Sequence, residues 1–366
     1  MLMKNMKKYV LIFGCILALS AACNRLDPFS GGYTDDVIGL GISNVQTKGL
    51  IADGEGTGLT ALDDAYTRIR VFDFMTAGTP STTVQYIDDV IKWKNAQTDP
   101  WDYVNGGPYR WTKTGTHKFF GYLTVAPGGT AFATANAPAW APDNQKLTVG
   151  SLEMTPASTQ FDFLYSGIIS RTMNNSADDD HSYVKLQFNH LFTALGVALK
   201  TADDIDEGVT IVVKKIKFTG LKTTRQAVID FSDDTDVSCE LNAGSSAAFT
   251  FTPSSALTLT GTAQTFMDYA LLWPQLPADT QTSTSADITD DTIIEITYNV
   301  GNANADETVT AKLNEAITQM DAGKKYLLTI TMKRTVDMKF ELLVDPLVEY
   351  FYDGVEGDYF DYLIKF

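Results

Sequence analysis

Residues 209–218 of this chain read VTIVVKKIKF, a short run of β-branched and aromatic residues between Gly208 and Gly220. Runs of this length and composition, bounded by turn-forming residues, are typical of β-strands. Similar runs recur along the chain, separated by clusters of Gly, Pro, Asn and Asp. They occupy residues 37–45, 68–74, 118–125, 161–166, 183–199, 209–218, 247–251, 266–272, 292–299, 325–333 and 340–344. The sequence therefore predicts an all-β protein of antiparallel β-sandwiches.

One segment departs from this pattern. Between Val309 and Met320 the apolar residues recur at helical spacing, and those on one side are Val309, Leu313, Ala316, Ile317 and Met320. We expect one short helix here, in the second half of the chain.

The chain has 366 residues, about twice the usual length of one domain. A polar run at residues 174–181, NNSADDDH, is the best boundary. It would separate an N-terminal β-sandwich domain, residues 37–181, from a C-terminal one, residues 182–366, each long enough to bury a core. A second polar run at residues 200–208 is the alternative boundary.

The N-terminus has the features of an exported protein. Three lysines precede an apolar run at residues 9–19, which is followed by Ser20-Ala21-Ala22-Cys23. This predicts a signal peptide over residues 1–22, too short to span a membrane. The four residues 20–23 resemble the lipobox of bacterial lipoproteins. This resemblance implies that Cys23 is lipidated (with palmitate) and that residues 23–36 form a tether. An ordinary signal peptide is the alternative.

Composition argues against several classes of protein. The formal net charge is −17, with 45 acidic against 28 basic residues, so nucleic acid is not an expected partner. Three histidines and three cysteines leave little material for catalysis or a transition-metal site. The glycine-rich run 54–58 lacks the Lys-Ser/Thr of a phosphate-binding loop, and the acidic clusters at 178–181 and 233–236 lack EF-hand spacing. We expect neither an enzyme, nor a cofactor, nor a metal.

Short motifs spread over most of the chain carry a family resemblance. In order, they are VQTKG at 45–49, IRVF at 69–72, YRW at 109–111, HKFFGY at 117–122, FDFLY at 161–165, VKLQFNH at 184–190, LLWPQ at 271–275 and AGKKY at 322–326. Together they resemble the fimbrillins of the Bacteroidales, the FimA/Mfa-like surface lipoproteins. The resemblance implies two transthyretin-like β-sandwich domains in tandem. It also implies subunits that build, anchor or cap fimbriae at the cell outer membrane and cell surface, with other fimbrial subunits as partners.

The first predicted strand alternates, with Ile38, Leu40 and Ile42 on one side and small residues on the other, which is typical of a half-buried strand. Lys48 and Gly49 follow, ahead of a glycine-rich run. The resemblance implies that a trypsin-like protease cleaves between them and so removes the lipidated first strand. The alternative is an ordinary first strand and loop.

The C-terminal residues 358–366 also alternate. Phe360, Tyr362, Ile364 and Phe366 form an apolar stripe. An extended segment of this kind can replace the removed first strand of another subunit, an assembly by donor-strand exchange. The alternative is that the stripe is the last strand of its own domain.

A second function remains open. The tryptophans at 93, 101, 111 and 140 lie in one stretch with the tyrosines at 86, 103 and 109. If exposed, such aromatics suit stacking on sugars, so the alternative is a carbohydrate-binding surface lipoprotein that does not polymerise. If buried, they cover the core of the first sandwich. A host or bacterial surface ligand is conceivable under either function.

Overall fold

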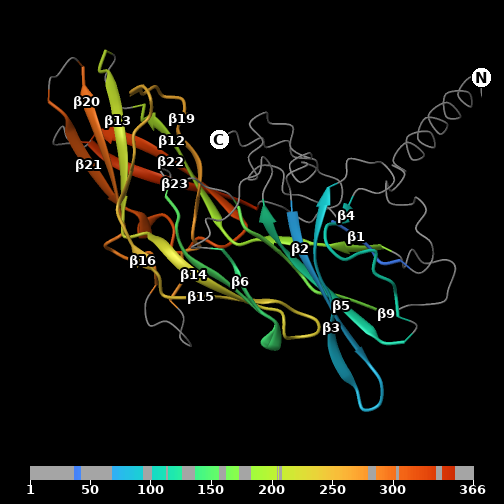
Figure 1. Ribbon diagram of the computed structural model, residues 1–366. Helices are drawn as coiled ribbons and strands as arrows, with labels where there is room; N and C mark the ends of the chain where they lie inside the picture. Colours follow the sequence, from blue (N-terminus) through green and yellow to red (C-terminus); the bar gives the residue numbers. More distant parts are fainter. Residues whose placement is uncertain are drawn as a thin grey trace, which may run out of the picture.

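A computed structural model describes residues 37–42, 68–93, 101–112, 114–125, 137–155, 162–172, 183–203, 205, 208–278, 286–301, 305–334 and 340–350. The predicted all-β class is confirmed, because these residues form strands apart from turns and two three-residue 3-10 segments, η3 (Pro142–Asn144) and η4 (Leu313–Glu315). The molecule is long. Strands β2 (Arg68–Ala77), β3 (Thr82–Trp93) and β5 (Thr116–Val125) lie at one end, and β13 (Ile211–Thr219), β20 (Ile293–Val300) and β21 (Glu307–Lys312) lie at the other (Figure 1). Between them lie β6 (Ala139–Ala141), β14 (Lys222–Asp230) and β15 (Ser238–Leu241). Within the described part of the chain, no helix is long and apolar enough to cross a membrane.

The first end is built on a central sheet with strand order β11-β8-β5-β2-β3-β4, and β9 pairs beside β5. Its strands are β2 (Arg68–Ala77), β3 (Thr82–Trp93), β4 (Trp101–Tyr103), β5 (Thr116–Val125), β8 (Leu164–Ser166), β9 (Ile169–Thr172) and β11 (Phe188–His190). Alternate residues of β2 and β5 point to opposite faces, so both faces of this sheet are apolar. A sheet of this kind needs a cover on each side.

One face is covered by a two-stranded sheet, β1 (Gly39–Ile42) and β10 (Tyr183–Leu186), which pair in parallel. The residues enclosed there form the first core. Its buried members are Ile38, Leu40, Ile69, Val71, Ile87, Ile91, Trp101, Trp111, Phe119, Leu123, Leu164, Val184 and Leu186.

The other face is covered by a sheet of order β15-β14-β7-β6, with β16 beside β14. Its strands are β6 (Ala139–Ala141), β7 (Lys146–Glu153), β14 (Lys222–Asp230), β15 (Ser238–Leu241) and β16 (Ser245–Ser246). The second core lies between the two sheets and is rich in aromatics, including Phe72, Phe120 and Phe231. Since β7 and β14 lie on opposite sides of residue 181, one sheet draws strands from both predicted domains. The domain boundary at residue 181 stays a prediction, since the strands of this sheet come from both sides of it.

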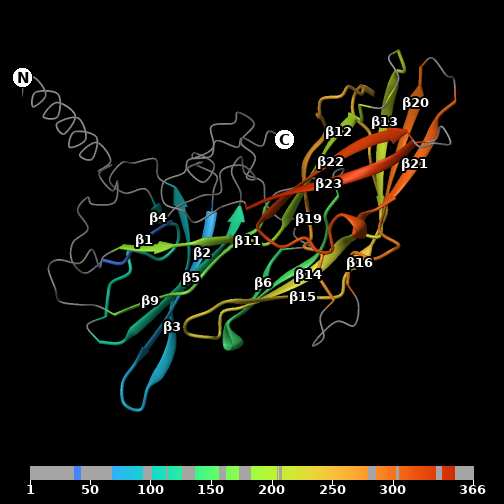
Figure 2. The same ribbon diagram turned by 180° about the vertical axis from the view of Figure 1, so that it is seen from behind.

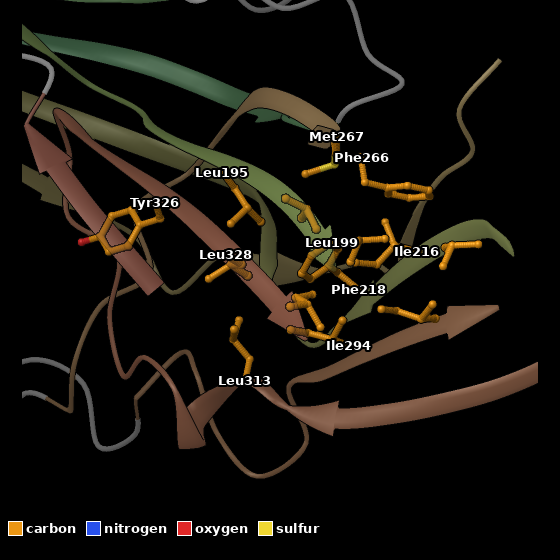
Figure 3. Packing of buried hydrophobic residues seen from close by; sticks show 14 of the residues in the cluster. Leu195, Leu199, Ile216, Phe218, Phe266, Met267, Ile294, Leu313, Tyr326 and Leu328 are labelled. Atoms are coloured by element: carbon orange, nitrogen blue, oxygen red, sulfur yellow. The ribbon is translucent and has the colours of Figure 1, made fainter. Parts of the chain in front are cut away.

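The far end is a β-sandwich of two sheets, of order β19-β12-β22-β23 and β17-β13-β20-β21, with β18 beside β13. The strands are β12 (Thr193–Thr201), β13 (Ile211–Thr219), β17 (Phe249–Phe251), β18 (Leu257–Thr258), β19 (Gln264–Leu272), β20 (Ile293–Val300), β21 (Glu307–Lys312), β22 (Lys324–Arg334) and β23 (Phe340–Tyr350). Side chains from both sheets meet in the third core, which Figure 3 shows around Phe218, Leu199 and Ile294. All sheet pairs here are antiparallel except β12 with β22.

The helix predicted over Val309–Met320 is not found. Residues 309–312 belong to β21, and only the 3-10 turn η4 follows. Most of the apolar stripe is buried all the same: Val309, Leu313, Ile317 and Met320 lie in the third core, and Ala316 is partly buried. A strand, a turn and an extended segment bury it instead, because β-branched residues flank Val309 and the edge of β20 is available for pairing.

Candidate functional site

Of the predicted site residues, those in the first strand are described best by the structure. Ile38 and Leu40 are 0% and 3% exposed, and both lie in the first core. In the two views, β1 runs beside β4 (Figures 1 and 2). Ile38 and Leu40 thus lie on the side predicted to be buried, but Gly39 between them is buried as well, and for Ile42 the structure describes only the backbone pairing with Leu186.

The first strand is held on both of its edges. Along one edge β1 pairs in parallel with β10, with Leu40 opposite Val184. Along the other edge, the amide of Ile38 donates to the carbonyl of Tyr109 over 2.9 Å, and Val37 forms an antiparallel bridge with Arg110. We call residues 109–112 the strap. The strap and β10 together form the seat of the first strand.

A tyrosine completes the contact at this end of the strand. The hydroxyl of Tyr103, from β4, donates to the carbonyl of Ile38 over 2.9 Å. Both backbone polar groups of Ile38 are therefore satisfied by residues outside β10. A buried backbone group needs such a partner, since leaving it unpaired costs about 1–3 kcal/mol.

The strap is fixed to the central sheet by side chains. The hydroxyl of Tyr86 in β3 donates to the carbonyl of Arg110 over 2.7 Å. The buried carboxylate of Asp89, also in β3, accepts from the amides of Asn105 and Gly106 at 3.1 and 2.7 Å. The same carboxylate accepts from the hydroxyl of Tyr109 at 3.3 Å. Burial and the neighbouring Asp89 charge together raise the pKa of Tyr109, so this hydroxyl stays a donor.

A buried histidine holds the end of the strap. His117 Nδ1 lies 2.5 Å from Asp73 Oδ2, and His117 Nε2 lies 2.8 Å from Thr112 Oγ1. Thr112 donates its own proton to the carbonyl of Thr114, so Nε2 must carry the hydrogen of its bond to Thr112. Burial raises the pKa of Asp73, and the hydrogen bond from His117 opposes this rise.

The order carboxylate, imidazole, hydroxyl is also that of a hydrolytic triad, but the roles differ. A catalytic hydroxyl gives its proton to the imidazole, whereas Thr112 gives its proton to a backbone carbonyl. His117 is fully buried, and its ring lies against those of Trp111, Phe119 and Tyr86. The geometry therefore suits holding the strap rather than activating a nucleophile.

Sequence reasoning missed this group. Asp73 is 44 positions away from His117, and only the pairing of β2 with β5 brings the two together. The other histidine in an apolar strand, His190, is likewise buried and hydrogen-bonded to a buried carboxylate, that of Asp162.

The tryptophans and tyrosines of residues 86–140 that the structure describes line the first and second cores. Trp101 and Trp111 are buried in the first core, and Trp140 stacks on Phe72 of the second core with ring centroids 4.2 Å apart. The three tyrosines at 86, 103 and 109 pack against the first core. The side chain of Trp93 lies outside the described residues. Of the two interpretations of this stretch, the structure supports aromatics that cover a core.

The acidic loop at 233–236 is organised by its own backbone. Asp233 accepts from the amides of Thr235 and Asp236 and from the Thr235 hydroxyl, and these bonds lower its pKa. The ammonium of buried Lys118 donates to the carbonyls of Phe231 and Asp233. Within the described ranges no group of three potential metal ligands is found. The cluster at 178–181 lies outside those ranges.

The remaining predicted site residues also lie outside the described residues. They are Cys23 for lipidation, Lys48 and Gly49 for cleavage, and Phe360, Tyr362, Ile364 and Phe366 for strand exchange.

Comparison with known proteins gives one family. The sequence model of the fimbrillin-like family matches residues 60–346. Among solved structures, a fimbrial protein from Bacteroides vulgatus is 16% identical with a TM-score of 0.49, and the alignment covers 87% of this chain and 100% of that one. A candidate cell adhesion protein from Bacteroides uniformis is 13% identical with a TM-score of 0.47, with the same coverage. Comparison with curated protein sequences gives no match.

Proposed function

We propose that this chain, which belongs to the fimbrillin-like family, is a lipid-anchored precursor of a fimbrial or adhesion subunit that assembles by exchanging its first strand. The proposal assigns it a role in binding and assembly at the cell surface rather than in catalysis. Its partners are then other fimbrial subunits, the outer membrane before cleavage, and a processing protease.

One observation carries the proposal: the first core depends on a short strand at the start of the chain. Ile38 and Leu40 are buried, yet among the described strands β1 pairs in a sheet with β10 alone. Burial of a large aliphatic side chain is worth roughly 1.5–3 kcal/mol. A chain that loses this strand therefore exposes an apolar seat, and it gains free energy by binding another strand there.

The sequence supplies a candidate for each further step. Cys23 would hold the precursor at the outer membrane through its lipid. Cleavage between Lys48 and Gly49 would separate the first strand from the rest of the chain. The stripe of Phe360, Tyr362, Ile364 and Phe366 from another subunit would then enter the seat, with backbone bonds giving affinity and alternate side chains filling it.

Removal of the predicted cleavage site by mutation tests this order of events. We expect Lys48→Ala to block both the loss of the N-terminal fragment and the formation of polymers after limited trypsin treatment. Lys214→Ala, which changes a lysine half-exposed on the far sandwich, is the matched control and should behave like the wild type. Mass spectrometry of wild-type polymers should show subunits that begin at Gly49. Polymers whose subunits all begin at Cys23 would contradict the proposal.

A further inference from the structure

Two carboxylates are buried on the face of the central sheet that carries the first core. Asp73 is 0% and Asp89 is 2% exposed. Burial of an acid in apolar surroundings is costly unless its oxygens accept hydrogen bonds. The hydrogen bonds of both carboxylates hold the loop that ends in the strap. Asp89 bonds to the loop amides and to Tyr109, while Asp73 acts through His117 on Thr112.

The two walls of the seat are held in different ways. Val184 and Leu186 of β10 are fully buried, and the chain runs on from them into β11 of the central sheet. Movement of this wall would take both side chains out of the first core. The strap places one buried side chain, Trp111, in that core, and its single β-bridge in the described structure joins Arg110 to Val37 of the first strand. Side-chain hydrogen bonds, which can open one at a time, also hold the strap.

We propose that the strap is the gate of the first-strand seat. Tyr86, Asp89 and the chain Asp73–His117–Thr112 are positioning residues that keep the strap against Ile38. Opening of the strap, rather than movement of β10, sets how fast the first strand leaves and another strand enters. This inference rests on the proposed exchange for its biological meaning, but the gate itself is a property of the intact chain.

The gate also specifies the direction of an incoming strand. The strap and Tyr103 bind the amide and the carbonyl of Ile38, not its side chain. Many sequences can therefore use these bonds, provided that the strand runs parallel to β10 as β1 does. Proline in the place of Ile38 has no amide to donate and would not be accepted.

Amide hydrogen exchange of the intact chain tests the gate. Thr112→Val and Tyr86→Phe each remove one hydroxyl that fixes the strap while keeping the shape of the side chain. Loss of one hydrogen bond should speed exchange at residues 37–42 by roughly two- to tenfold. Exchange in β12 and β22 of the far sandwich should not change. Thr112→Ser keeps the hydroxyl and should restore slow exchange.

The matched control is Thr124→Val, which removes a hydroxyl on β5 that bonds to the carbonyl of Arg68 and does not touch the strap. It should leave residues 37–42 as slow as in the wild type. The gate is overturned if neither strap variant speeds exchange at 37–42, or if the control speeds it equally. Because the readout needs neither cleavage nor assembly, a failure of the proposed function would show separately, as wild-type chains that are not cut at Lys48 or do not polymerise.

Discussion

The first and third cores solve the same packing problem with different covers. The third core lies between two regular sheets, and its edge strand β23 pairs with β22 along its whole length, from Phe340 opposite Arg334 to Tyr350 opposite Lys324. The first core is closed on one face by β1 and β10, with four residue pairs between them, and by the strap with Trp111. A ladder of eleven residue pairs therefore holds the edge of the third core. The exchange that we propose needs a shorter ladder, such as that of β1 and β10.

The two cores also differ in chemistry. The third core consists of apolar residues and the tyrosines Tyr298 and Tyr326. The first core is bordered by Asp73, Asp89 and His117, whose bonds fix the strap. Apolar packing has no preferred direction, whereas hydrogen bonds fix a particular backbone in a particular place. The strand exchange that we propose would use such directional bonds to receive a new backbone in the same place.

The largest effect is expected in the third core. Phe218 is 1% exposed and stacks on Phe249 with ring centroids 5.2 Å apart. We expect Phe218→Ala to destabilise the far sandwich by about 3–5 kcal/mol, because no strand can leave and a cavity remains. Thermal melting followed by circular dichroism would measure this. A loss below about 1 kcal/mol would show that the third core is not the rigid part of the molecule.

A smaller and local effect is expected in the first strand. We expect Leu40→Ala to weaken the hold on β1 by about 2 kcal/mol, at the lower end of the range for such a change, because the strand can detach instead of enclosing a cavity. Exchange of amides at 37–42 should rise while the melting of the far sandwich stays the same. If the whole molecule melts earlier by the same amount, the two cores form one cooperative unit.

The smallest effect depends on pH. Burial raises the pKa of Asp73 above its ordinary value of 3.8, so the folded protein keeps this proton at a higher pH than the unfolded chain does. The stability contributed by this group is therefore present at and below the ordinary value and is lost as pH rises through the folded value. We expect Asp73→Asn to flatten the pH dependence of exchange at 37–42 on the side above the ordinary value of 3.8. An unchanged slope there would show that Asp73 does not titrate above its ordinary value.

Much of the strand pattern was predictable from the sequence. The run VTIVVKKIKF became β13, and the alternation around Ile38 gave the correct buried side. Strand β14 was missed, because its buried positions include Thr223 and Arg225. Burial of Arg225 is offset by an ion pair with Asp287 and by a hydrogen bond to the carbonyl of Asn242, both distant in sequence. The single run predicted over 183–199 is divided into β10, β11 and β12, which belong to three different sheets.

The candidate site was predictable only in part. Local alternation identified the first strand, since a half-buried strand has the same period wherever it pairs. The strap could not be found in this way, because its anchors come from β2, β3 and β5 and meet only after these strands pair. The parallel pairing of β1 with β10, across more than 140 positions, has no local signal either.

The most direct test is a competition for the seat of the first strand. The chain is cleaved after Lys48, and a synthetic peptide of residues 358–366 is added while mass spectrometry follows the bound N-terminal fragment. We expect the peptide to displace that fragment and remain bound, whereas a peptide with Tyr362→Asp and Ile364→Asp does not. Retention of the fragment at every concentration of the native peptide would contradict the claim that the first strand is exchangeable for the C-terminal one.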